Sequence, residues 1–145
     1  MEDKIIKLAT AKLAKEKGFK EKTFFSYEIN RNNNFVLCWG EFLGRPPVNE
    51  GGYKVHPKYK LNNHNSNKQY KVYSAPTQSL LQRWLREVHD IHIEIIIWDN
   101  NTWSAQIVGD SFENNDDEYE ASGCKTYEEA LEIGLQEALK LIKEK

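Results

Sequence analysis

Apolar residues recur at three- and four-residue spacing in three stretches of the chain, and each stretch predicts an amphipathic helix. The first spans about residues 2–17 and gathers on one side Ile5, Ile6, Ala9, Leu13 and Ala14. The second follows Ser74 as the expected N-cap, with Pro76 in its first turn, and its stripe comprises Leu80, Leu81, Trp84, Leu85 and Val88. The third buries Tyr127, Ala130, Leu131, Leu135, Ala138 and Ile142.

Local signals mark two helix ends. Gly18 supplies the left-handed residue that ends a helix, and Phe19 is placed to fold back on Leu13 or Ala14. At the start of the third helix, Thr126 and Glu129 stand in the spacing of a capping box.

Two-residue alternation predicts a hairpin in "TFFSYEINRNNNFVLCWGEF". Alternating apolar residues occupy both arms, namely Phe25, Tyr27 and Ile29, then Phe35, Leu37 and Trp39. The asparagines at 32–34 tolerate the left-handed backbone that a tight turn needs.

A second hairpin is predicted in "HIEIIIWDNNTWSAQIVG", and its register follows from the pattern. A three-residue loop, 99–101, sets Ile97 opposite Trp103, Ile95 opposite Ala105 and Ile93 opposite Ile107, so one face is wholly apolar. A two-residue loop would mix apolar and polar residues on both faces. The three-residue loop is therefore expected.

Further strands are expected at 69–73 and in "YEASGC". Together these elements predict an α+β fold, with a central, mainly antiparallel β-sheet and two or three helices packed on it, mostly on one face. The helix between the 69–73 strand and the strand from Ile91 also permits one parallel pair.

The chain of 145 residues predicts a single domain over 1–145 with a real core. Periodicity fails in a long irregular loop at about 43–68 and in an acidic loop at about 110–118. Long loops of this kind commonly carry function.

The net charge of −2 conceals a strong division along the chain. Up to Arg86 there are 16 Lys and Arg against 7 Asp and Glu, a balance of +9. From Glu87 onward there are 4 against 15, a balance of −11. Such asymmetry bears on association and partners rather than on the fold.

The N-terminus lacks the apolar core of a signal peptide, and no apolar run is long enough to span a membrane. Cys38 and Cys124 stand far apart in the chain and are expected to be reduced and structural. The sequence therefore predicts a protein of the cytoplasm that does not act at a membrane.

Four histidines raise the question of catalysis or metal binding. His89 ends a helix and His92 begins a strand, so the two rings need not converge, although a site with Glu94 stays open. No phosphate loop, nucleophile elbow, CxxC or HExxH is present. We expect no enzyme activity, no metal and no cofactor.

Two charged surfaces are the candidate binding sites. The first interleaves aromatic and basic side chains, the pattern of single-stranded nucleic-acid binders, and comprises Tyr53, Lys54, Lys58, Tyr59, Lys60, Arg83 and Arg86. The second is acidic and suits a basic partner, with Asp116, Asp117, Glu118 and Glu120. Ordinary solvated loops are the alternative interpretation of both.

Three stretches, "AKLAKEKGF", "SAPTQSLLQRWLREVHDIHIEI" and "KTYEEALEIGLQEALKLI", resemble a family of small uncharacterised proteins encoded by phages and prophages of Bacteroides-type bacteria. The resemblance covers about half of the chain and leaves out 20–73 and 108–123. It implies a setting in a bacterial host, and no catalytic residues come with it.

Two functions are expected from these observations. In the first, a phage or prophage accessory protein binds stoichiometrically to a host protein, as an anti-CRISPR-like inhibitor of a defence nuclease, with the nuclease or its guide RNA as the partner. In the second, the protein binds single-stranded RNA directly through 53–60, Arg83 and Arg86. The oligomeric state is left open.

Overall fold

The computed structural model describes residues 3–30, 32–39, 48–49, 52–53, 65, 72–108 and 121–143. Its elements follow one another along the chain as α1 (Leu8–Glu16), β1 (Phe25–Ile29), β2 (Phe35–Trp39), β3 (Val48–Asn49), β4 (Gly52–Tyr53), β5 (Val72–Ser74), α2 (Gln78–His89), β6 (His92–Ile97), β7 (Trp103–Val108), β8 (Ala121–Cys124) and α3 (Tyr127–Lys140).

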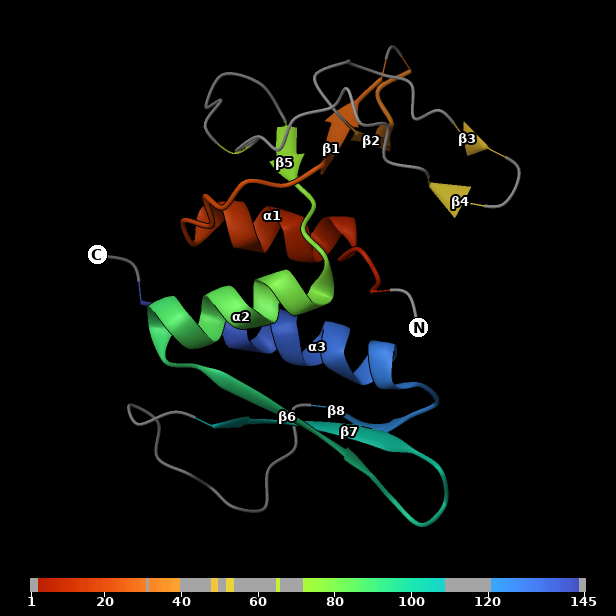
Figure 1. Ribbon diagram of the computed structural model, residues 1–145, viewed down its shortest axis with the longest axis vertical. Coiled ribbons are helices and arrows are strands. Elements are labelled where there is room, and N and C mark those ends of the chain that lie inside the picture. Colours follow the sequence, from red (N-terminus) through yellow and green to blue (C-terminus); the bar gives the residue numbers. More distant parts are fainter. Residues whose placement is uncertain are drawn as a thin grey trace.

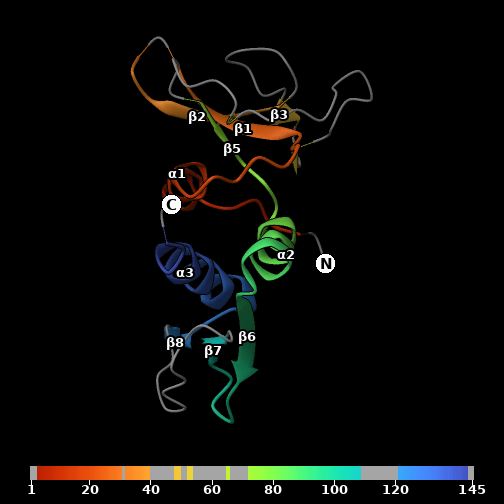
Figure 2. The same cartoon turned by 90° about the vertical axis from the view of Figure 1, so that its left-hand side faces the viewer.

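The helices lie between two antiparallel sheets (Figure 1). The sheet β2-β1-β5 covers α1 on one side, and the sheet β6-β7-β8 lies against α3 on the other. In the view turned by 90°, α2 and α3 lie side by side between α1 and the lower sheet (Figure 2). The α+β class with antiparallel strands and three helices is thus confirmed.

The expectation of one central sheet is wrong, although each three-stranded sheet has the helices on one face (Figure 1). The described strands of three or more residues divide into two sheets, because β5 pairs with β1 rather than with β6. Every strand pair among the described residues is antiparallel, so the alternative of a parallel pair across α2 is not realised there.

Both predicted hairpins form, and the second has the predicted register. Tyr27 lies opposite Leu37 in the first hairpin, and Ile95 lies opposite Ala105 in the second. The loop 99–101 closes the second hairpin, where the Trp98 amide donates to the Thr102 carbonyl at 2.9 Å. Asn101 takes the left-handed conformation, with φ 60°, that such a loop requires. The third strand predicted from "YEASGC" is β8.

Helix α1 begins six residues later than expected. Ile5 forms a bridge with Thr77, and the Ile6 amide donates to the Pro76 carbonyl at 3.1 Å, so this segment is extended. Asp3 accepts hydrogen bonds from the main chain and side chain of Ser79 and so caps α2 rather than α1. The buried residues of α1 are Thr10, Ala11 and Ala14, whereas Ala9 is exposed.

The predicted C-terminal signal of α1 is confirmed. Gly18 has φ 90°, its amide donates to the Lys15 carbonyl, and the Phe19 amide donates to the Ala14 carbonyl at 2.9 Å. This is the Schellman pattern. It turns Phe19 into the core, where its ring meets that of Trp84 edge-on at 5.2 Å.

Helix α2 is capped by Thr77, whose side chain accepts from the Leu80 amide, so the expected cap at Ser74 is wrong. The reason is tertiary: Ser74 stays in β5 opposite Ser26 of β1. Leu81, Trp84 and Leu85 are buried as predicted.

Besides Ala9, two further members of the predicted helical stripes are exposed. Val88 of α2 lies outside the core, and Tyr127 of α3 is exposed at the first turn. The capping signal of α3 is confirmed, since the Thr126 hydroxyl accepts from the Glu129 amide at 3.1 Å. The Glu129 carboxylate in turn accepts from the Lys125 amide.

Part of the expected loop at 43–68 is described. The short strands β3 and β4 pair with each other, with Val48 opposite Tyr53. Asn65 ties the loop to the fold, because its side chain donates to the Phe19 carbonyl and accepts from the Ser74 amide, both at 2.8 Å.

Candidate functional site

Arg83 and Arg86 are the predicted basic residues that the structure describes in full, and both are exposed on α2. Burial of Trp84 and Leu85 on the opposite side fixes this orientation. Arg83 Nε lies 4.0 Å from the Glu87 carboxylate, an exposed pair that contributes little to stability. Arg86 forms no ion pair with a described residue and is available to a partner.

The other predicted binding residues lie outside the described residues or are described only in part. Tyr53 contributes its main chain to β4, and its side chain is not among those described. The remaining basic-surface residues, Lys54, Lys58, Tyr59 and Lys60, and the acidic set Asp116, Asp117, Glu118 and Glu120 lie outside the described residues. Their roles stay predictions.

The lysines of α1 pack against aromatic rings of the upper sheet. Lys12 Nζ lies 4.8 Å from the centre of the Phe35 ring, and Lys15 Nζ lies 5.1 Å from that of Tyr73. Lys15 Nζ also donates to the Val72 carbonyl at 2.8 Å, and burial lowers the pKa of Lys15. These cations join α1 to the sheet, a role that helical periodicity did not reveal.

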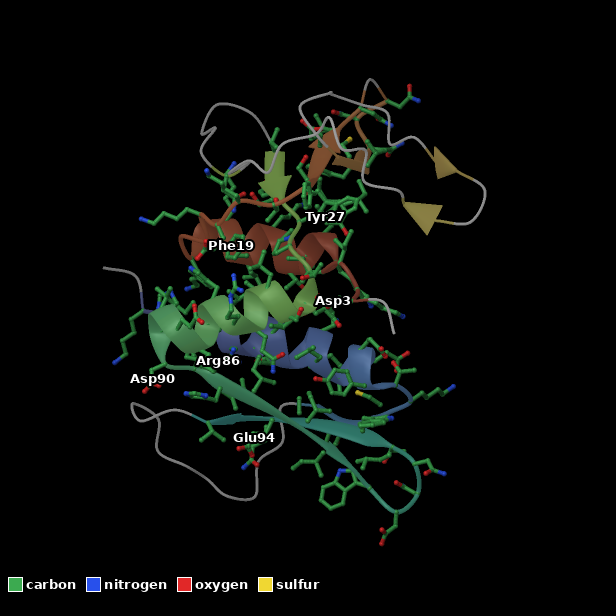
Figure 3. All side chains as sticks on the ribbon, in the orientation of Figure 1. Asp3, Phe19, Tyr27, Arg86, Asp90 and Glu94 are labelled. Carbon is green, nitrogen blue, oxygen red and sulfur yellow. The ribbon has the colours of Figure 1, made fainter. Side chains whose placement is uncertain are left out.

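His89 and His92 do not share a site. The His89 ring packs edge-on against Trp84, with ring centres 4.6 Å apart. His92 Nε2 lies 3.1 Å from an Asp90 carboxylate oxygen at the surface, and Glu94 points away from the helices (Figure 3). Within the described ranges, no group of three or more His, Cys, Asp or Glu side chains could hold a metal ion.

A buried carboxylate joins the three helices and was missed by the sequence analysis. Glu132 of α3 is 4% exposed and accepts hydrogen bonds from the Thr10 hydroxyl, the Lys7 amide at 3.2 Å and the Gln78 side chain at 3.2 Å. Gln136 extends the network by donating to Thr10. The carboxylate thus occupies the positive N-terminal end of α1, which has no side-chain cap of its own.

A second buried polar cluster lies on the upper sheet. Ser26, Glu28, Cys38 and Ser74 are each at most 7% exposed, and strand pairing sets Ser26 directly between Cys38 and Ser74. Burial raises the pKa of Glu28, and the neighbouring Ser26 and Cys38 side chains lower it only in part. A carboxyl group beside a thiol can exchange protons, but the described atoms provide no substrate position beside it.

The cysteines do not pair. Cys38 is buried on β2 and Cys124 is half-buried on β8, so the two thiols belong to different sheets. Burial, and then the charge of Glu129, raise the pKa of the Cys124 thiol. The thiolate, the reactive form, is therefore disfavoured.

A hollow of about 220 Å³ lies where α2 and α3 begin, lined in part by Asp3, Gln78, Ser79 and Tyr127. Helix N-termini attract anions. Here the chain supplies the anion itself, because Asp3 binds the first turn of α2 (Figure 3).

The fold separates part of the divided charge. Among the described residues, the segments 3–30, 32–39 and 72–77, which form α1 and the upper sheet, carry seven basic and four acidic side chains. The segments 78–108 and 121–143, which form α2, α3 and the lower sheet, carry five basic and eight acidic ones. The positive balance thus belongs to α1 and the upper sheet, and the negative balance to α2, α3 and the lower sheet, with the three helices adjacent in the middle of the molecule (Figure 1).

No protein-family model, curated protein or solved structure matches the chain. Among the described helices, none has the length and apolar character needed to cross a bilayer.

Proposed function

We propose that the protein acts by stoichiometric binding, as a phage or prophage accessory protein that inhibits a host defence nuclease in the manner of an anti-CRISPR protein. The observation that carries this proposal is the division of charge along the chain, +9 up to Arg86 and −11 after it. The resemblance to phage-encoded proteins supplies the setting.

Electrostatic complementarity explains how such a protein would act. Nucleases hold their nucleic acids in basic channels, whose affinity comes largely from phosphate contacts. The carboxylates of Asp116, Asp117, Glu118 and Glu120 would take the place of phosphates in such a channel. Electrostatic steering would speed association with a basic partner. The basic residues, of which Arg83 and Arg86 are exposed on α2, would contact guide RNA or the nuclease surface.

Affinity capture from a lysate of the bacterial host tests the proposal. We expect the wild-type chain to retain a nucleic-acid-processing protein in a fixed ratio. A variant carrying Asp116→Asn, Asp117→Asn, Glu118→Gln and Glu120→Gln should lose it. A control with Glu87→Gln and Glu94→Gln, at two exposed acids of the described part, should retain it. Recovery of no protein, together with no effect on any defence system of the host, would remove the proposal.

A second candidate function is direct binding of single-stranded RNA, and the exposure of Arg83 and Arg86 on one helix favours it. Affinity for a single-stranded oligonucleotide should then fall steeply with salt. The double change Arg83→Glu and Arg86→Glu should weaken binding, as should Lys54→Glu, Lys58→Glu and Lys60→Glu. The matched control changes two exposed bases to Glu, namely Lys140 at the end of α3 and Lys143 after it. Equal affinity of all these variants would exclude this function.

A further inference from the structure

Among the strands that the structure describes, β6 is an edge strand of the lower sheet, whose order is β6-β7-β8. Its sequence, HIEIII, is rich in isoleucine and contains neither lysine nor proline, the residues that commonly protect an edge from pairing with another chain. An unprotected apolar edge is a template for an added strand.

Hydrogen bonding shows which main-chain groups of β6 face the open side. Trp98 and Thr102 form a hydrogen-bonded pair, so the alternation of an antiparallel ladder directs Glu94 and Ile96 toward β7. The amides and carbonyls of Ile93, Ile95 and Ile97 therefore point outward. The Gln82 side chain confirms this assignment, because it donates to the outward Ile93 carbonyl at 3.1 Å.

Gln82 covers one end of the edge, and no other described residue covers the other end. No described residue hydrogen-bonds to the outward main-chain groups of Ile95 or Ile97. Apolar side chains are exposed at this end, with Ile97 54% and Trp98 43% accessible. The open segment therefore offers main-chain donors and acceptors beside apolar surface, the combination that strand addition uses.

We propose that this edge pairs with β6 of a second copy of the chain, antiparallel and around a twofold axis between the two Ile96 residues. In this register Ile95 forms hydrogen-bonded pairs with the second copy's Ile97, and Ile97 with the second copy's Ile95. The two three-stranded sheets then become one continuous sheet of six strands, and the Gln82 bond to Ile93 is kept.

The second copy is favoured because this register is self-complementary. Ile96 meets Ile96, and Glu94 lies opposite the second copy's Trp98, so no like charges stand directly across the axis. The same register brings the second copy's Asp99 to the level of Ile93, beside Gln82. Arg86 lies one turn from Gln82 on the same face of α2 and is free to pair with that carboxylate.

The first test uses the unchanged protein. Sedimentation velocity should show a species of twice the 17.0 kDa of the chain that grows with concentration. Hydrogen exchange at the Ile95 and Ile97 amides should slow about tenfold or more over the same range, because dimerisation supplies their acceptors. A chain that stays monomeric at its highest soluble concentration, with these amides exchanging fast throughout, would overturn the proposal.

A charge-pairing test defines the axis. Ile96→Lys alone and Ile96→Glu alone should each give monomers, because like charges would meet across the axis, and an equal mixture should restore the dimer. Ile29→Lys, which changes an exposed isoleucine in the other sheet, should leave dimerisation unchanged. If each single variant dimerises as well as the wild type, or if folded single variants fail to associate when mixed, the proposed register is wrong.

Discussion

The two sheets of this protein bury opposite kinds of side chain. The lower sheet, β6-β7-β8, lays its apolar face on α3 so closely that a Cβ at Gly134 would lie 3.0 Å from Ala105 Cβ. The upper sheet, β2-β1-β5, turns Tyr27 and Tyr73 toward α1 and buries Ser26, Glu28 and Ser74 on its other face. The alternation of apolar residues therefore identified the apolar face of both sheets. In the lower sheet this apolar face is buried more deeply than the opposite face, whereas in the upper sheet the opposite, polar face is buried more deeply.

The difference follows from what faces each sheet. Helix α3 presents small and apolar residues to the lower sheet, so contact there is dispersion and hydrophobic burial. Helix α1 presents lysines to the upper sheet, so contact there depends on cations over aromatic rings and on Tyr27, whose hydroxyl donates to the Ile6 carbonyl at 2.7 Å. We expect mutations to be costlier on the α3 side.

The largest effect is expected at the carboxylate that holds the helices together. Glu132→Ala should lower the free energy of unfolding by about 3 kcal/mol, because it leaves the Thr10 hydroxyl, the Lys7 amide and the Gln78 side chain without their buried acceptor. Urea denaturation followed by circular dichroism measures this. Glu137→Gln, at the surface of the same helix, serves as the control and should change stability by less than about 0.5 kcal/mol. A loss at Glu132 no greater than at Glu137 would contradict the assigned role.

The close approach of α3 to the lower sheet predicts the next effect. Gly134→Leu should destabilise the protein by about 2 kcal/mol, because Ala105 and Ile93 leave no space for a larger side chain. Thermal denaturation should show a lower midpoint for this variant. At the neighbouring, partly exposed position, Ile133→Leu should leave the midpoint nearly unchanged. If both variants melt together, the packing described for α3 is incorrect.

The buried carboxyl of the upper sheet predicts a pH dependence. The pKa of the Glu28 carboxyl is raised in the folded state. At a pH between the ordinary and the raised pKa, the folded protein therefore keeps the Glu28 proton and the unfolded chain loses it. The contribution of Glu28 to the free energy of unfolding is therefore most favourable below the ordinary pKa of 4.5. It is lost as the pH rises through the raised pKa of the folded state.

Glu28→Gln should remove this dependence. The variant should be more stable than the wild type at neutral pH, by less than about 1 kcal/mol, and the difference should shrink as the pH falls. Paired urea titrations from pH 4 to pH 8 would show it. A difference that grows on acidification has the wrong sign and would contradict the assignment.

The smallest effect concerns the lysines between α1 and the upper sheet. Lys12→Gln should cost about 0.5 to 1 kcal/mol, since the cation over Phe35 and Tyr73 is lost. Lys7→Gln is the matched control, because the exposed Lys7 engages the fold through its main-chain amide. Equal stability of the two variants would show that the cation–π contacts contribute nothing measurable.

Local chemistry made much of this fold predictable. The register of β6 with β7 followed from alternating isoleucines and a loop of three residues, and Gly18 and Thr126 marked helix ends correctly. The failures arise where distant segments meet. Asp3 was expected in the first turn of the first helix. Instead it caps α2 through Ser79, 76 residues away in the sequence. Nothing local reveals such a partner.

The candidate site was predictable only in part. Exposure of Arg83 and Arg86 followed from the helical stripe, because the apolar residues between them had to face the core. Glu132 was missed, since a glutamate in a helix is usually solvated and its buried partners come from α1 and α2. The division of the strands between two sheets was missed for the same reason: alternation fixes faces and register but not which hairpins join.

A plasmid-interference assay of the host's defence nuclease tests the central claim, inhibition by stoichiometric binding, most directly. In cells that produce increasing amounts of the protein, we predict that interference falls and is abolished once the chain matches the nuclease in number. The variant lacking the charges of Asp116, Asp117, Glu118 and Glu120 should leave interference intact. Full interference at every level of folded wild-type protein, in each defence system of the host, would contradict the account.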